Sequence, residues 1–204
     1  MTSAFGHFSN FGFVRDTVPP ELLDELQAEI DSIDLAEPIK DKLAGNLETS
    51  YVLEKSRTNL EKFVLGLANA YSVGFDATQT GKNLTGDNLS LRLFWVNFQR
   101  KHEFNPIHMH DGDFSFVIWL KVPYKLADEV NMPRSKNSNM PRGGMFSFFY
   151  TNIFGEIREA EFPIDELWEG QILLFPACLQ HMVYPFASTD DVRVSISGNI
   201  KRNE

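Results

Sequence analysis

The hydrophobic pattern of this chain changes its period near residue 90, and this change restricts the folds open to it. Before that point, apolar residues recur at helical spacing in two stretches, from Leu22 to Ile33 and from Leu60 to Tyr71. After it, residues 91–99 alternate between two faces, and further short apolar runs follow between turn residues. The pattern predicts an α+β chain in which an antiparallel jelly roll follows N-terminal helices.

The length of 204 residues suits one sizeable core rather than two. We therefore expect a single domain over residues 1–204, with an N-terminal arm and helices in 1–88 and a jelly-roll core in 89–204. Polar residues, prolines and a Gly-Gly pair fill residues 124–144, which predicts a mobile insertion of the kind that often forms a lid. The apolar neighbours of the single cysteine, Cys178, predict that it is buried.

Charge and composition exclude several classes of protein. The formal net charge is −9 and no stretch is rich in Lys and Arg, which argues against binding along duplex DNA. One cysteine cannot form an intrachain disulfide, and no segment has the apolar length of a membrane span. We expect a cytoplasmic protein without membrane contact, in the host cytoplasm if a phage encodes it. The oligomeric state stays open, with a homodimer as one option.

Two histidines lie two residues apart in the stretch 105–117, which ends in a predicted strand. Side chains at positions i and i+2 of a strand point to the same face, so His108 and His110 can bind one metal ion. A third ligand must come from elsewhere in the chain, and His181 is the candidate. These three histidines are the predicted metal ligands.

A second pair of polar residues follows later in the chain. Arg193 and Ser195 share one face of the last strand and can together hold a carboxylate. If this strand forms a hairpin with the strand that carries His181, all three residues lie close together. A dicarboxylic 2-oxo acid fits, with its far carboxylate on Arg193 and Ser195 and its 2-oxo end on an iron ion. The alternative is a structural ion pair between Arg193 and Asp190 or Asp191.

The combined motifs resemble the 2-oxoglutarate and Fe(II)-dependent oxygenase superfamily. They are similar, more narrowly, to oxygenases of marine bacteria and their phages whose motif reads His-x-His-x-Gly. The likeness spans residues 91–200 and rests on His108-x-His110, on Gly170-Gln-Ile-Leu-Leu-Phe-Pro with His181, and on Arg193-x-Ser195. By position it implies that His108 is the first iron ligand, His181 the distal ligand, and Arg193 with Ser195 the cosubstrate anchor.

The resemblance also implies a fold and a reaction. The fold is a double-stranded β-helix, a cupin-like jelly roll with the N-terminal helices packed on it. The cofactor is Fe(II) and the cosubstrate is 2-oxoglutarate. The reaction couples decarboxylation of 2-oxoglutarate to succinate with the hydroxylation by dioxygen of an unidentified substrate. Arg193 and the three histidines are then catalytic, Asn97 contacts the cosubstrate, and Gln99, Trp95 and Trp119 line the pocket.

The first motif departs from the superfamily's usual His-x-Asp or His-x-Glu, which leaves three arrangements open. His110 can itself be a ligand, which the i, i+2 geometry permits without distortion. Asp111 or Asp113 can supply a carboxylate after a local bend. Alternatively, His110 can be the first ligand, with Gly112 at the carboxylate position and water completing the site.

Two other functions compete with the oxygenase. A cupin-like metal dioxygenase or isomerase can use three histidines but has no need of 2-oxoglutarate or of a dicarboxylate anchor. A non-catalytic jelly-roll binding module would have structural histidines. For any of these, a small molecule or a peptide is a better expected partner than duplex DNA, because the chain is acidic.

Overall fold

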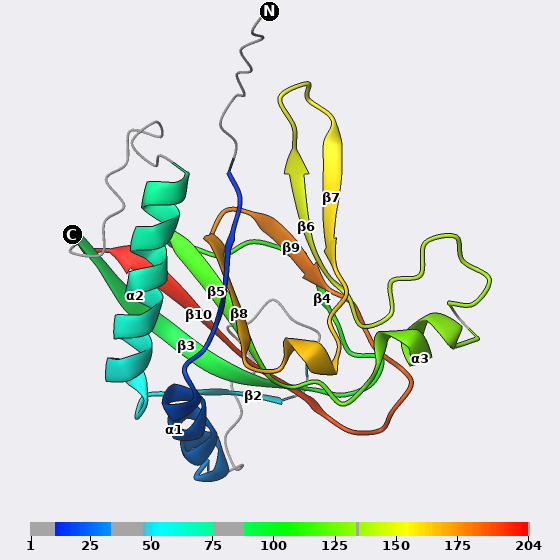
Figure 1. Cartoon of the computed structure of the whole chain (residues 1–204), viewed down its shortest axis with the longest axis horizontal. Coiled ribbons are helices and arrows are strands. Elements are labelled where there is room, and N and C mark those ends of the chain that lie inside the picture. The colour runs from blue at the N-terminus through cyan, green and yellow to red at the C-terminus, as the bar shows by residue number, and fades with distance from the viewer. Residues whose placement is uncertain (1–10, 34–46, 48, 76–87, 134, 204) are drawn as a thin grey trace, which may run out of the picture.

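The computed structural model describes residues 11–33, 47, 49–75, 88–133 and 135–203. The first ten residues of the expected N-terminal arm, and residues 76–87 of the expected loop before the sheet, lie outside this part. The elements, drawn in Figure 1, are β1 (Val14–Thr17), α1 (Pro20–Asp31), β2 (Thr49–Val52), α2 (Arg57–Gly74), β3 (Leu89–Gln99), β4 (Asn105–His108), β5 (Phe114–Lys121), α3 (Leu126–Asn131), β6 (Phe146–Thr151), β7 (Ile157–Phe162), the 3-10 turn η3 (Glu166–Trp168), β8 (Gln171–Pro176), β9 (Gln180–Val183) and β10 (Arg193–Arg202).

The strands form two antiparallel sheets. The six-stranded sheet has the order β1-β8-β5-β10-β3-β2, and the four-stranded sheet has the order β4-β9-β6-β7. This arrangement confirms the predicted jelly roll. The sequence did not predict β2, because residues 35–56 show no clear period and β2 itself has only four residues.

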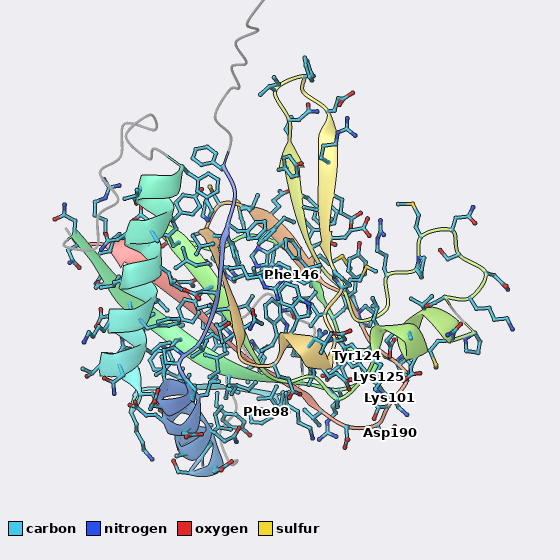
Figure 2. The ribbon with its side chains drawn as sticks, in the orientation of Figure 1. Phe98, Lys101, Tyr124, Lys125, Phe146 and Asp190 are labelled. Carbon is cyan, nitrogen blue, oxygen red and sulfur yellow. The ribbon has the colours of Figure 1, made fainter. Side chains whose placement is uncertain are left out.

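Alternation along the strands of the six-stranded sheet divides the apolar residues between two cores. On β5, Phe116 and Ile118 pack in the core that also contains the buried residues of α1 and α2. Between them, Val117 points to the other face, where it joins Phe146 of the four-stranded sheet. Figure 2 shows Phe146 in this second core. The helices α1 and α2 therefore cover the outer face of the six-stranded sheet, as expected, and leave its inner face to the second sheet (Figure 1).

Two details differ from expectation. Cys178, predicted to be buried, is exposed, because it lies in the short connection between β8 and β9. The insertion 124–144 contains α3 and makes several contacts with the connection before β10, which are described below. Among the described residues, no helix is both long and apolar enough to cross a membrane.

A buried carboxylate fixes α1 to the segment before α2. Glu29 accepts hydrogen bonds from the backbone N–H groups of Glu54, Lys55 and Ser56 at 2.6–2.8 Å, and from the Ser56 hydroxyl at 2.6 Å. Burial raises the pKa of Glu29, but these hydrogen bonds outweigh it and hold the pKa below its ordinary value. A lowered pKa in the folded state stabilises the fold above the ordinary carboxyl pKa. This stability is lost as the pH falls through the lowered value.

We expect Glu29→Gln to lower the free energy of unfolding at pH 7 by about 1–3 kcal/mol, because an amide replaces the charged acceptor of buried donors. The loss should shrink as the pH falls and the wild-type carboxylate becomes protonated. Urea denaturation at pH 7 and in acid measures both effects. Glu21→Gln, at an exposed position of α1, should change the free energy by less than about 0.5 kcal/mol and is the matched control. Equal stability of Glu29→Gln and wild type at pH 7 would contradict this account.

Candidate metal and carboxylate site

A cavity between the two sheets brings together the residues predicted from the motifs. One wall comes from inward-facing positions of β3, β5, β8 and β10 of the six-stranded sheet, and the other from β4, β6 and β9 of the four-stranded sheet. The lining includes Trp95, Asn97, Gln99, Asn105, His108, His110, Trp119, Phe146, Phe175, His181, Arg193, Ser195 and Ser197.

The three histidines meet at one end of this cavity. His108 at the end of β4 lies directly opposite His181 on β9 in the strand register. His110 follows β4, and its backbone N–H donates to the Ala177 carbonyl at 2.9 Å, which holds it beside the other two. One ring nitrogen from each histidine lies within 4.8 Å of the other two. Among the described residues this is the group of side chains that can hold a metal ion.

Hydrogen bonds orient two of the three rings. Nδ1 of His108 lies 2.7 Å from the Pro106 carbonyl oxygen, and Nδ1 of His181 lies 2.9 Å from the Leu179 carbonyl oxygen. A carbonyl oxygen only accepts, so Nδ1 carries the hydrogen in both rings, and the lone pair is on Nε2. Such a second contact commonly fixes the tautomer of a metal-binding histidine.

The protonation state also suits metal binding. Burial, together with repulsion from the neighbouring His108, lowers the pKa of His181 to about 3 and that of His110 to about 4. Burial lowers the pKa of His108 as well, against the opposing effect of its hydrogen bond to Pro106. All three rings are therefore neutral at physiological pH, which is the form that binds a metal. This donor set fits Fe(II), for which imidazole is a suitable ligand.

The two aspartates that follow His110 are engaged elsewhere. Asp111 is highly exposed and forms an ion pair with Lys201 at 3.1 Å. Asp113 accepts a hydrogen bond from the backbone N–H of Arg202 at 2.8 Å. Gly112 between them has φ = +133°, and a Cβ there would lie 2.9 Å from the Ile200 carbonyl oxygen. Of the three arrangements left open by the sequence, the geometry favours the first, in which His108, His110 and His181 together form the ligand set.

Arg193 lies buried in the wall opposite the histidines, with 2% of its surface exposed. Its NH1 donates to the Tyr124 hydroxyl and, at 3.4 Å, to the Gly144 carbonyl. Its NH2 donates to Gln99 Oε1 and, at 3.4 Å, to the Tyr184 carbonyl. These described partners are neutral, and a buried cation is costly without a negative charge. A bound carboxylate would supply that charge.

The structural alternative for Arg193 does not hold. Asp190 forms an ion pair with Lys101 at the surface, and Figure 2 shows the two next to each other. Asp191 is exposed, and no ion pair joins it to Arg193 in the part of the chain that the structure describes. The expected hairpin is also wrong. β9 pairs with β4 and β6, whereas β10 pairs with β3 and β5, so His181 and Arg193 belong to different sheets. They line the same cavity because the connection between β9 and β10 crosses from one sheet to the other.

Polar groups lie next to Arg193 on the same wall. Ser195 faces the cavity, and its hydroxyl makes no hydrogen bond with any residue that the structure describes. Asn97 is oriented by the Trp95 indole N–H, which donates to its Oδ1 at 3.1 Å, while its Nδ2 donates to the Ser197 hydroxyl at 3.3 Å. The free Ser195 hydroxyl fits a bound carboxylate oxygen.

The sequence predicted only one of the two side chains that accept a hydrogen bond from Arg193. Gln99 was expected to line the pocket, although its hydrogen bond to Arg193 was not. Tyr124 was not singled out at all, because it stands in the polar insertion and no local pattern relates it to Arg193, 69 residues away. The signal in the sequence is only that an aromatic residue with a hydroxyl stands three residues after the end of β5.

Comparison with known proteins agrees with this geometry. A family model described as "Putative 2OG-Fe(II) oxygenase" matches residues 93–199. No curated protein matches the sequence. Among solved structures, a prolyl-4-hydroxylase from Pseudomonas putida is similar, with a TM-score of 0.59, 15% identity, and coverage of 95% of this chain and 94% of that one. An oxidoreductase of the 2OG-Fe(II) oxygenase family from Burkholderia pseudomallei gives a TM-score of 0.56, 20% identity, and coverage of 95% and 86%. At these identities the likeness concerns the fold.

Proposed function

Since this chain belongs to the 2OG-Fe(II) oxygenase family, an oxidoreductase family that uses Fe(II) and 2-oxoglutarate, we propose that it hydroxylates a second substrate with decarboxylation of 2-oxoglutarate to succinate. In this proposal His108, His110 and His181 hold the iron. Arg193 and Ser195 bind the distal carboxylate of 2-oxoglutarate. The observation that carries the proposal is one cavity with three neutral imidazoles on one wall and a buried guanidinium with neutral partners on the other.

The iron, when bound, supplies the redox chemistry by which dioxygen oxidises 2-oxoglutarate and the second substrate. The residues of the chain bind and orient. His108, His110 and His181 would hold the iron, and a set of three protein ligands would leave room on it for the 2-oxo acid and dioxygen. Arg193 and Ser195 fix the far end of the acid, and the apolar rings of Trp119, Phe146 and Phe175 exclude bulk water from the cavity. The second substrate in this proposal is a small molecule or a peptide rather than duplex DNA, since the net charge of −9 disfavours binding to a phosphate backbone.

Anaerobic titration of the metal-free protein tests the proposal. We expect one equivalent of Fe(II) to bind, and added 2-oxoglutarate to produce the weak visible charge-transfer band of a chelated 2-oxo acid. Iron binding without the band would favour a cupin-like metal enzyme that does not use 2-oxoglutarate. A protein that binds no iron would instead be a non-catalytic binding module.

A further inference from the structure

A buried carboxylate in the insertion 124–144 binds the connection that leads to β10. Glu129 of α3 has no exposed surface. Both of its carboxylate oxygens accept from the backbone N–H of Ala187, at 2.9 and 3.0 Å, and Oε1 also accepts from the N–H of Ser188 at 2.7 Å. Hydrogen bonds to a charged acceptor are stronger than those between neutral groups. Glu129 therefore fastens two segments that are far apart in the sequence.

These two segments supply three of the four hydrogen-bond acceptors around Arg193, and the fourth is Gln99 of β3. The insertion contributes the Tyr124 hydroxyl and the Gly144 carbonyl, and the connection contributes the Tyr184 carbonyl. Phe186, directly before Ala187, stacks on the Tyr124 ring with centroids 4.9 Å apart. The guanidinium carbon of Arg193 lies 5.6 Å from the Phe186 ring centroid and 5.9 Å from that of Tyr124. The carboxylate of Glu129 thus joins both sides of the enclosure that holds the guanidinium.

Close packing leaves the end of the insertion little room to move apart from Glu129. A Cβ at Gly143 would lie 2.8 Å from Glu129 Oε2. Gly144 has φ = +75°, and a Cβ there would lie 2.6 Å from the Tyr124 ring. The backbone N–H of Gly144 donates to the Pro185 carbonyl at 3.0 Å, and that of Tyr184 donates to the Met145 carbonyl at 2.9 Å. These contacts attach the end of the insertion to the connection before β10.

We propose that Glu129 is a positioning residue for binding of the cosubstrate. Glu129 fastens Ala187 and Ser188 to α3, and this holds the Arg193 guanidinium in the orientation that binds the distal carboxylate of 2-oxoglutarate. The inference rests on the proposed function, because it needs Arg193 to be the carboxylate anchor. Glu129 does not touch the cosubstrate. Its effect comes through geometry, since a guanidinium recognises a carboxylate through N–H groups in a fixed planar arrangement.

The test compares two 2-oxo acids on the Fe(II)-loaded protein under nitrogen. One is 2-oxoglutarate and the other is 2-oxobutanoate, which lacks the distal carboxylate. We expect Glu129→Ala to raise the Kd for 2-oxoglutarate about tenfold, at the lower end of what loss of an orienting partner costs in metal sites. The Kd for 2-oxobutanoate should not change. Glu129→Gln keeps an oxygen that can accept from Ala187 and Ser188, so its Kd for 2-oxoglutarate should rise less.

Glu29→Gln is the matched control, because Glu29 is also a buried carboxylate that accepts several backbone N–H groups, but it belongs to α1 and binds the segment before α2. It should destabilise the protein without changing either Kd. An unchanged Kd for 2-oxoglutarate in the Glu129 variants, or an equal rise for both acids, overturns the role of Glu129. If Glu129→Ala does not fold, Glu129→Gln carries the test. A wild type that binds 2-oxoglutarate no better than 2-oxobutanoate overturns the anchor itself, and with it the proposed function.

Discussion

Replacing His181 by alanine is expected to abolish stoichiometric binding of Fe(II). His181 is 4% exposed and faces His108 across the paired strands β4 and β9, so no neighbouring side chain can take its place without a change in the register. The loss should exceed the roughly 10- to 100-fold that removal of an outer partner of a metal ligand costs. Anaerobic titration and metal analysis of the purified variant measure it.

The control is a histidine outside the cavity. His102 has φ = +70°, a conformation that asparagine tolerates better than most residues, so His102→Asn should fold and bind iron as the wild type does. Full iron occupancy in His181→Ala would show that the cluster is structural.

The same titration distinguishes the three arrangements at the first motif. His110→Ala should weaken iron binding strongly, whereas Asp111→Asn and Asp113→Asn should bind iron normally, because their carboxylates contact Lys201 and Arg202. Loss of iron in either aspartate variant would assign the carboxylate to the metal.

Replacing Arg193 by methionine is expected to raise the Kd for 2-oxoglutarate roughly 30-fold or more. Loss of one partner of a buried, hydrogen-bonded charge pair costs about 2–5 kcal/mol, and about 1.4 kcal/mol corresponds to a factor of ten. Iron should still bind, since the guanidinium is not part of the histidine cluster. Binding can also be followed by the rise in Tm that 2-oxoglutarate causes, because a ligand that binds only the folded state stabilises it.

Arg92→Met is the control for this variant, because Arg92 is an exposed arginine of β3, the strand that pairs with β10. It should leave the affinity for 2-oxoglutarate unchanged. If Arg193→Met bound 2-oxoglutarate as tightly as the wild type, the carboxylate anchor would have to be assigned to another group of the cavity.

Local patterns in the sequence predicted the elements that have a strong period. The alternation on β3 and the helical stripes of α1 and α2 follow from burial of one face, and burial is visible in a single sequence. The histidines and Arg193 were predicted because each stands in a short motif. Their meeting in one cavity was predicted correctly, although for a wrong reason, since β9 and β10 do not pair.

Contacts over long sequence distances were not predictable in this way. The pairing of β9 with β4 and β6 depends on how nine residues between β9 and β10 cross from sheet to sheet, and no turn motif specifies that crossing. Glu129 looks like any acidic residue of a short polar helix, and only the folded chain brings Ala187 to its carboxylate. The exposure of Cys178 likewise depends on where β8 ends.

The site residues are divided between the two sheets of the jelly roll. The histidines belong to the four-stranded sheet and the elements next to it, and Arg193 and Ser195 belong to the six-stranded sheet. The two sets meet at His110, whose backbone N–H donates to Ala177 directly after β8 of the six-stranded sheet. In the proposed roles, substitutions on β10 and β3 would change which 2-oxo acid is recognised, and substitutions on β4 and β9 would change which metal is bound.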